Sequence, residues 1–189
     1  MDDAMTKEGE SNSTKQEVLS DQSRPGEKLQ APFDGYRDVV RSDWIDENGH
    51  MNMGYYVVVF DFATDAWLDF VGLDTEHRRR RKIATFSLES HVIYAREVRG
   101  GDELRFATRL LDFDAKRIHY FHEMHQAREG YLAATNELMS LHVSQETRRS
   151  TPMAPAILER LAEIQRAHRT LPSPPQVGRV MGLRAPSTT

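Results

Sequence analysis

Cysteine is absent from the 189 residues of the chain. This absence excludes a disulfide framework, thiol catalysis and thiolate metal ligands. Long hydrophobic runs are also missing, since no window approaches the roughly 20 apolar residues that a bilayer-spanning helix needs. The chain begins with acidic Asp2 and Asp3, whereas a secretory signal would place positive charge ahead of an apolar run. We therefore expect a cytoplasmic protein without redox chemistry of its own.

The folded part of the chain is predicted to be nearly neutral. The net charge is -4, and residues 1–34 hold eight acidic and four basic side chains, which leaves 21 of each kind for the remainder. A nucleic-acid or anionic-membrane surface would require a basic excess on the folded domain. The composition therefore predicts a globular domain with neither a nucleic acid nor a membrane as partner.

Three segments differ in composition along the chain. Residues 1–32 are rich in Ser, Glu, Lys, Gln and Asp with almost no bulky apolar side chains, which predicts a disordered tail. Residues 171–189 contain four prolines among Ser, Thr and Gly, which predicts an extended or disordered segment. A single domain is expected over 33–170, with a short peripheral helix at about 155–168.

One long helix is the clearest element. From Met53 to Val71 apolar side chains recur at three- and four-residue spacing, Asn52 is suited to the N-cap, and Gly72 is suited to the C-terminal cap. Patterns typical of strands occur at about 36–45, 83–95, 103–113, 117–127 and 131–145. Short turns imply antiparallel neighbours, and the helix can cover one face of their sheet. We predict an α+β fold in which an antiparallel five-stranded sheet wraps around one long central helix.

The turn before this helix is the strongest candidate for a catalytic site. Asp46 lies three residues before Gly49 and shortly before the helix begins. A carboxylate held there could act as a nucleophile or as a general base toward water, while free amides at the helix N-terminus stabilise an oxyanion. Taken alone, Asp-x-x-Gly before a helix is more often only a turn. His50 and Asn52 could position water or substrate, or could merely satisfy the turn and cap the helix.

The string from Trp44 to Tyr56, placed before a long helix and four strands, resembles the hotdog-fold acyl-CoA thioesterases of the 4-hydroxybenzoyl-CoA type. The resemblance covers about 36–146. It implies that Asp46 is the catalytic carboxylate and that an amide near Met53 polarises the thioester carbonyl. It also implies a homodimer or homotetramer with active sites at the subunit interface, and neither a cofactor nor a metal.

Four segments resemble the betainyl-CoA thioesterases of carnitine breakdown more narrowly: 44–51, 60–65, 114–122 and 134–143. This resemblance implies hydrolysis of a small acyl-CoA, with betainyl-CoA giving glycine betaine in carnitine catabolism. Substrate contacts are then expected from Trp44, Gly49, Tyr55 and Tyr56.

Aromatic rings near the turn could also hold a trimethylammonium group, at about 0.5–2 kcal/mol per ring. The candidates are Trp44, Tyr55, Tyr56, Phe60 and Trp67. Core packing is the simpler explanation for Phe60 and Trp67, because they recur at helical spacing. Tyr55 is the better candidate for such a cage.

Lys116 and Arg117 are the candidates for binding coenzyme A, because the resembling family places basic residues in this turn to hold the nucleotide phosphates. Arg148 and Arg149 could assist them. The basic run 78–82 is predicted to be a solvated connection instead.

Other polar side chains are candidates for a second acid/base pair or a metal site. Thr85, Glu89 and His91 would share one face of a strand, although surface or interface ion pairing is the preferred explanation for them. In the strand 117–127, His122 would point away from His119 and His125, which would lie about 20 Å apart at ~3.3 Å per residue. These three histidines cannot share a metal ion.

Hydrolysis of a small acyl-CoA by Asp46 is therefore the preferred function. A hotdog enoyl-CoA hydratase or dehydratase is less favoured, because the spacing from Asp46 to His50 is one residue shorter than the hydratase pattern and lacks its proline. A non-catalytic acyl-CoA-binding protein is the remaining alternative.

Overall fold

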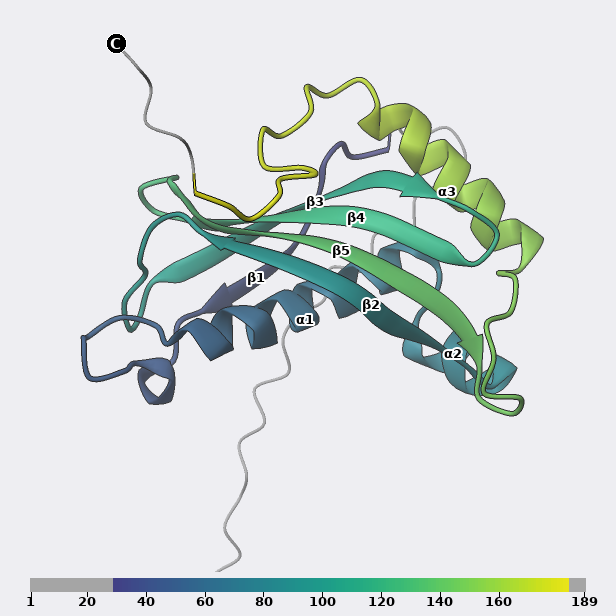
Figure 1. Ribbon diagram of the computed structural model, residues 1–189, viewed down its shortest axis with the longest axis horizontal. Helices are drawn as coiled ribbons and strands as arrows, with labels where there is room; N and C mark the ends of the chain where they lie inside the picture. Colours follow the sequence, from purple (N-terminus) through teal and green to yellow (C-terminus); the bar gives the residue numbers. More distant parts are fainter. Residues whose placement is uncertain (1–28, 184–189) are drawn as a thin grey trace, which may run out of the picture.

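The computed structural model describes residues 29–183 (Figure 1). The far ends of both predicted tails lie outside this range. The elements in chain order are β1 (Phe33–Val39), a 3-10 turn (Ser42–Trp44), α1 (Met53–Val71), α2 (Thr75–Arg81), β2 (Ile83–Tyr94), β3 (Glu103–Phe113), β4 (Arg117–Gln126), β5 (Leu132–Ser144) and α3 (Pro155–His168).

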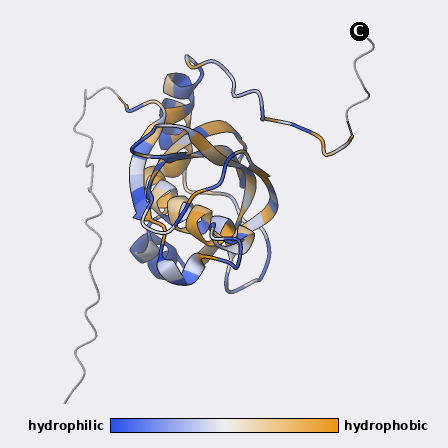
Figure 2. Cartoon of the chain, turned by 90° about the vertical axis from the view of Figure 1, so that its left-hand side faces the viewer, coloured by the Kyte–Doolittle hydropathy of each residue, from blue (hydrophilic) through white to orange (hydrophobic). Residues whose placement is uncertain are grey.

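The five strands form one sheet in the order β1-β3-β4-β5-β2, and every neighbouring pair is antiparallel. The sheet curls around α1, which lies along its concave inner face (Figures 1 and 2). The predicted hotdog fold, a five-stranded antiparallel sheet around one long helix, is thereby confirmed.

The bounds of α1 follow from its caps. The Asn52 side chain accepts a hydrogen bond from the Gly54 N–H at 2.9 Å, and Gly72 ends the helix with a φ of +96°, where a side chain would be strained. Between the caps, Phe60, Ala63 and Trp67 are almost completely buried against the sheet. The apolar stripe predicted from the spacing is therefore the face that fills the core.

Helix α3 contributes more to the core than its predicted peripheral position suggested. Leu161 and Ile164 are fully buried and belong to the same apolar cluster as Trp67. His168 joins α3 to both β3 and α1, because its Nδ1 accepts the Leu110 N–H at 2.9 Å and its ring lies against Trp67.

Two boundaries differ from the prediction. The first strand ends at Val39 rather than continuing toward Ile45, because the chain turns to bury Trp44. The basic connection is a helix, α2, whose N-cap Asp74 accepts the His77 N–H at 2.7 Å. No residue of α2 is buried, so it offers no apolar periodicity that would predict a helix.

The prediction that Thr85, Glu89 and His91 share one face is wrong. A bulge at Leu88 adds one residue between the pairs Ser87–Ser140 and Glu89–Met139. Because each extra residue reverses the alternation of side chains, Thr85 lies on the inner face while Glu89 and His91 lie on the outer face.

The three histidines of β4 alternate as predicted. His122 is fully buried on the inner face, between the hydroxyls of Thr64 at 3.0 Å and Thr108 at 2.8 Å. His119 and His125 instead pair with the outer-face carboxylates Glu137 and Glu123. Burial lowers the pKa of His122 to about 3, so this side chain is a neutral part of the core.

Strand β2 leaves one long edge of the sheet open. Residues 86–90 are all exposed, and they include Phe86 and Leu88, which are 49% and 55% exposed. A long apolar edge strand is a template for pairing with another chain. Within residues 29–183, no helix is long and apolar enough to span a membrane.

Candidate active site

The segment 46–52, called the Asp46 loop below, is a narrow turn closed by its own backbone. Asp46 N–H donates to His50 O at 3.0 Å, Gly49 N–H donates to Asp46 O at 3.0 Å, and the carboxylate accepts the Asn48 N–H at 2.8 Å. Gly49 has a φ of +80°, a conformation that glycine adopts without strain. These contacts fix the carboxylate just ahead of α1.

The first amide of α1 is available to a ligand. The Gly54 N–H is taken by the Asn52 side chain, and the Tyr55 N–H donates to the Asn52 carbonyl at 3.0 Å. The Met53 N–H has no hydrogen-bond partner within residues 29–183. Since it sits at the positive end of the helix dipole, it is suited to stabilise a developing oxyanion.

These groups meet in one pocket of about 510 Å³. Its lining consists of Asp46, Asn48, His50, Met51, Asn52, Met53, Tyr56, Tyr94, Ala95, Arg96 and Glu97. All four predicted catalytic positions therefore line the same pocket, as does the predicted substrate contact Tyr56.

Trp44 and Tyr55 do not line this pocket and pack against each other instead. Their rings stack with centroids 5.5 Å apart, and the Arg41 guanidinium lies 4.6 Å from the centre of the Trp44 ring. Trp44 is also buried, so it has no free face for a cationic ligand. Gly49 shapes the loop without lining the pocket.

Tyr94 and Glu97 reach the pocket from the end of β2 and the segment after it, and sequence reasoning missed both. The Tyr94 ring packs edge-on against Tyr56 with centroids 5.1 Å apart, and its hydroxyl donates to the Met53 carbonyl at 3.3 Å. Burial raises the pKa of the Tyr56 phenol, which keeps it neutral. Glu97 pairs with His50 Nε2 at 3.0 Å.

Lys116 and Arg117 lie at the opposite end of the sheet from Asp46. They form the β3–β4 turn, where Asp114 accepts both of their backbone N–H groups and pairs with the Arg117 guanidinium. The Lys116 amide, followed by the Arg117 side chain, holds the pKa of Asp114 below its usual value. Arg117 is therefore partly neutralised, whereas the only partner of the Lys116 ammonium in the described part of the chain is the Ser150 hydroxyl, at 3.4 Å.

The separation of the two ends can be estimated along β5. His142 donates its N–H to the Lys116 carbonyl, while Ala134 pairs with Tyr94 beside the Asp46 pocket. Eight residues of strand at ~3.3 Å each separate these two positions, or about 26 Å. Within one chain, the predicted phosphate contacts therefore do not meet the predicted catalytic carboxylate.

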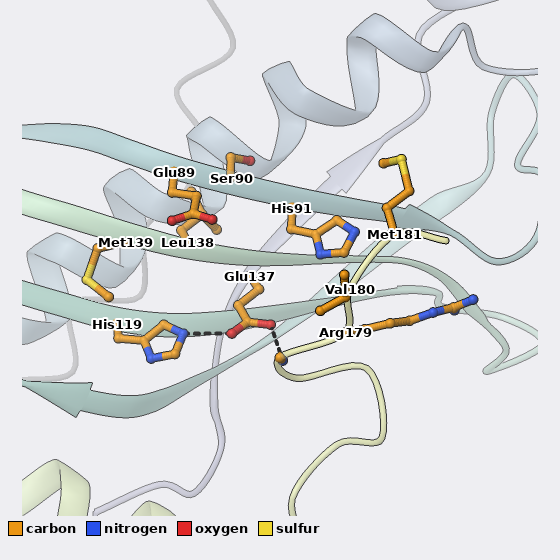
Figure 3. A pocket seen from close by; sticks show the side chains of 11 residues that line it. Glu89, Ser90, His91, His119, Glu137, Leu138, Met139, Arg179, Val180 and Met181 are labelled. Carbon is orange, nitrogen blue, oxygen red and sulfur yellow. Dashed lines mark hydrogen bonds and ion pairs between the residues drawn. The ribbon is translucent and has the colours of Figure 1, made fainter. Parts of the chain in front are cut away.

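Glu89 and His91 line a different pocket, of about 550 Å³, on the outer face of the sheet (Figure 3). Glu137 occupies its floor, where it pairs with His119 at 2.8 Å and accepts the Gly178 N–H at 2.7 Å. The segment that follows Gly178 forms the other wall. These acidic and imidazole groups do not reach Asp46 within the same chain.

Comparison with known proteins identifies the family. Residues 40–161 match the family described as the thioesterase-like superfamily, a range that holds the Asp46 loop, α1 and four of the five strands. The chain therefore belongs to the thioesterase-like superfamily.

Individual relatives agree with this assignment. The betainyl-CoA thioesterase of Pseudomonas aeruginosa is 39% identical over 148 residues, which are 78% of this chain and 93% of that protein. The L-carnitine dehydrogenase/betainyl-CoA thioesterase of Rhizobium meliloti is 33% identical over 76% of this chain, which spans 29% of that longer protein. A hypothetical protein of Staphylococcus aureus, solved in complex with CoA, superposes with a TM-score of 0.76 at 27% identity, covering 84% of this chain and 100% of that one. The predicted resemblance to hotdog-fold thioesterases is confirmed.

Proposed function

We propose that the protein hydrolyses acyl-CoA thioesters in the Asp46 pocket, with betainyl-CoA as its substrate. The observation that carries this proposal is that one pocket holds both the Asp46 carboxylate and the Met53 N–H, which has no hydrogen-bond partner among residues 29–183. The amide receives the carbonyl oxygen as negative charge develops on it, and the carboxylate either attacks the carbonyl carbon or takes a proton from the attacking water. The coenzyme A thiolate leaves in both cases.

The pocket lining supports a cationic acyl group. Asp46 and Glu97 contribute two carboxylates against the one guanidinium of Arg96, and Tyr56 and Tyr94 contribute adjoining aromatic rings. This combination suits a quaternary ammonium group, because ring faces and negative charge attract it and it needs no hydrogen-bond partner. The Pseudomonas aeruginosa relative, named for betainyl-CoA, agrees with this substrate.

The complete site is formed by two subunits in this proposal. Antiparallel pairing of β2 with β2 of a second copy would bury Phe86 and Leu88, and would place the Ile83 end of one strand beside the Tyr94 end of the other. The partner subunit's Lys116 would then lie at the same end of the assembly as Asp46. A homodimer thus brings together the catalytic carboxylate and a cation for the coenzyme A phosphates.

A thiol-release screen tests this function. Because the chain contains no cysteine, a thiol reagent reports only released coenzyme A. Short, aromatic and quaternary-ammonium acyl-CoAs are compared, and betainyl-CoA is expected to give the highest kcat/KM. Faster release from a neutral isostere of the betainyl group would overturn the assigned acyl group. Tight acyl-CoA binding in calorimetry without any thiol release would instead favour the non-catalytic binding protein.

A further inference from the structure

The chain after α3 crosses the outer face of the sheet as a strap, residues 172–183 (Figures 1 and 3). The Arg109 guanidinium of β3 donates to the Pro172 carbonyl, and Pro174 is buried. Further along, the Gly178 N–H donates to Glu137 of β5 at 2.7 Å. The strap is therefore anchored at two points, and it runs from β3 toward β2, the strand at the open edge of the sheet.

The end of the strap holds apolar side chains in water next to β2. Val180 and Met181 line the outer-face pocket together with His91 of β2 (Figure 3). Both side chains nevertheless remain 86% exposed. Exposed apolar groups on an anchored segment are typical of a surface that contacts another chain.

Phe86 is a second exposed apolar side chain on the same face. It pairs with Leu141 of β5, and alternation along β5 puts Leu141 on the face that carries Glu137. His91 pairs with Glu137, which lies under the strap. Four residues of β5 separate Leu141 from Glu137, or about 13 Å at ~3.3 Å each. Within one chain, Phe86 and the strap therefore lie apart.

Pairing of β2 with β2 of a second copy removes this separation. Residues directly opposite each other in an antiparallel pair point to the same face, so Phe86 must stand opposite another outer-face residue. A two-fold axis through the middle of Ile83–Tyr94 places the partner subunit's Phe86 opposite His91. Neighbouring strands lie about 4.8 Å apart. The ring would then stand beside the pocket wall formed by Val180 and Met181.

We infer that the strap is a clasp between subunits, in which Val180 and Met181 of one chain pack on the partner subunit's Phe86. This inference rests on the homodimer of the proposed function. The two-fold axis creates two such contacts, one from each strap. They cover the outer side of the junction between the two β2 strands, where strand pairing alone leaves Phe86 in water. The clasp thereby stabilises an assembly whose active sites take residues from both chains.

A disulfide test measures this contact directly, because the chain has no cysteine of its own. Phe86→Cys and Val180→Cys chains are purified separately, mixed, allowed to exchange subunits and oxidised mildly. We expect a covalent mixed dimer on a non-reducing gel, since a disulfide requires Cα atoms within about 7 Å of each other. Neither variant should crosslink alone, because the two-fold axis leaves its two engineered thiols about 13 Å apart.

Val39→Cys is the matched control for this mixture. Val39 is 46% exposed, close to the 49% of Phe86, but it lies on β1 at the other edge of the sheet. Mixed with Val180→Cys, it should give no covalent dimer.

The double variant Val180→Ser with Met181→Ser measures what the clasp contributes to the assembly. Both side chains are exposed within one chain, so their replacement should leave the fold intact. Each dimer loses the apolar contacts of both straps, and we expect its Kd in analytical ultracentrifugation to rise roughly tenfold or more. Val39→Ser, which removes an exposed apolar side chain elsewhere, should leave this Kd unchanged.

A wild-type dimer that gives no covalent link between Phe86→Cys and Val180→Cys after confirmed exchange would overturn the clasp while leaving the proposed hydrolysis intact. An unchanged Kd in the double serine variant would overturn it as well. If the wild-type protein sediments as a monomer, the two-subunit site fails together with the clasp. Absence of thiol release from every acyl-CoA would instead refute hydrolysis alone, since the crosslink does not depend on turnover.

Discussion

Gly49 shows how a single backbone angle supports the Asp46 loop. A side chain at this position would meet nothing within 4 Å, so the cost of adding one comes from the φ of +80°. Gly130 has a φ of +75° and equally open surroundings, but lies in the β4–β5 turn. These two glycines differ in location rather than in strain.

We therefore expect Gly49→Ala and Gly130→Ala to cost similar free energies of unfolding, about 1–2 kcal/mol each. Only Gly49→Ala should reduce thiol release, because only that strain acts on the Asp46 carboxylate. Chemical denaturation and the thiol assay measure the two effects. Equal activity of both variants would show that the loop geometry is not critical.

Buried histidines predict the response of the fold to acid. Burial lowers the pKa of His122 to about 3 and that of His168 to about 4, both below the ordinary 6.5. Between pH 4 and 6.5 the unfolded chain therefore binds more protons than the folded chain, and stability falls as the pH falls. Above 6.5 this contribution is complete.

The free energy of unfolding should decrease by up to about 1.4 kcal/mol per pH unit for each of the two histidines as the pH falls from about 6.5 toward 5. Denaturant titrations at several pH values measure this slope. His168→Gln should reduce this slope, because it removes one of the two buried imidazoles. A slope that is the same in His168→Gln as in the wild type would contradict the assignment.

At the scale of elements, regular patterns were predictable and local irregularities were not. The limits of α1 follow from its spacing and caps, and four strands follow from alternation. The bulge at Leu88 leaves no mark in composition, yet it moves Glu89 and His91 to the other face. Helix α2 had only a capping aspartate, Asp74, to indicate it.

The site likewise contains residues that were predictable from the sequence and residues that were not. The predicted catalytic positions meet in one pocket because they are neighbours in sequence, within the loop and the first turn of α1. Tyr94 and Glu97 arrive through tertiary contacts, such as the bond from Met51 N–H to the Val98 carbonyl, and no local motif marks them. The roles assigned to these side chains remain predictions.

The open edge of β2 gives a prediction at this scale. Leu88→Lys should prevent pairing of β2 with a second copy and yield a monomer in analytical ultracentrifugation, because a lysine on an edge strand opposes strand pairing. Val39→Lys is the control, since Val39 is 46% exposed on β1 at the other edge of the sheet. A Leu88→Lys protein that stays dimeric would exclude this interface.

For the whole molecule, the proposed homodimer places Lys116 with the Asp46 of the other subunit, because about 26 Å separate the two ends of β5 within one chain. Lys116→Glu should raise KM for acyl-CoA roughly tenfold or more, since it replaces a phosphate-binding charge by a repelling one. Asp46→Asn should remove turnover. A homodimer of either variant therefore has two defective sites.

Mixing the Lys116→Glu and Asp46→Asn chains shows whether an active site takes these two residues from one chain or from two different chains. In a heterodimer, one site combines the intact Asp46 of one chain with the intact Lys116 of the other. A randomly exchanged equal mixture should therefore recover about a quarter of wild-type activity at low substrate concentration. Recovery of no activity after confirmed subunit exchange would place both residues in one chain's site.

The most direct test of the central claim compares Asp46→Asn with the wild-type protein in single-substrate thiol release, with coenzyme A binding measured by calorimetry. Asparagine keeps the size of the side chain and its acceptor for the Asn48 N–H, but it can neither attack a carbonyl as an anion nor take a proton. We predict a loss in kcat of about 10³-fold or more with nearly unchanged affinity for coenzyme A. Comparable turnover in the variant would contradict hydrolysis by Asp46.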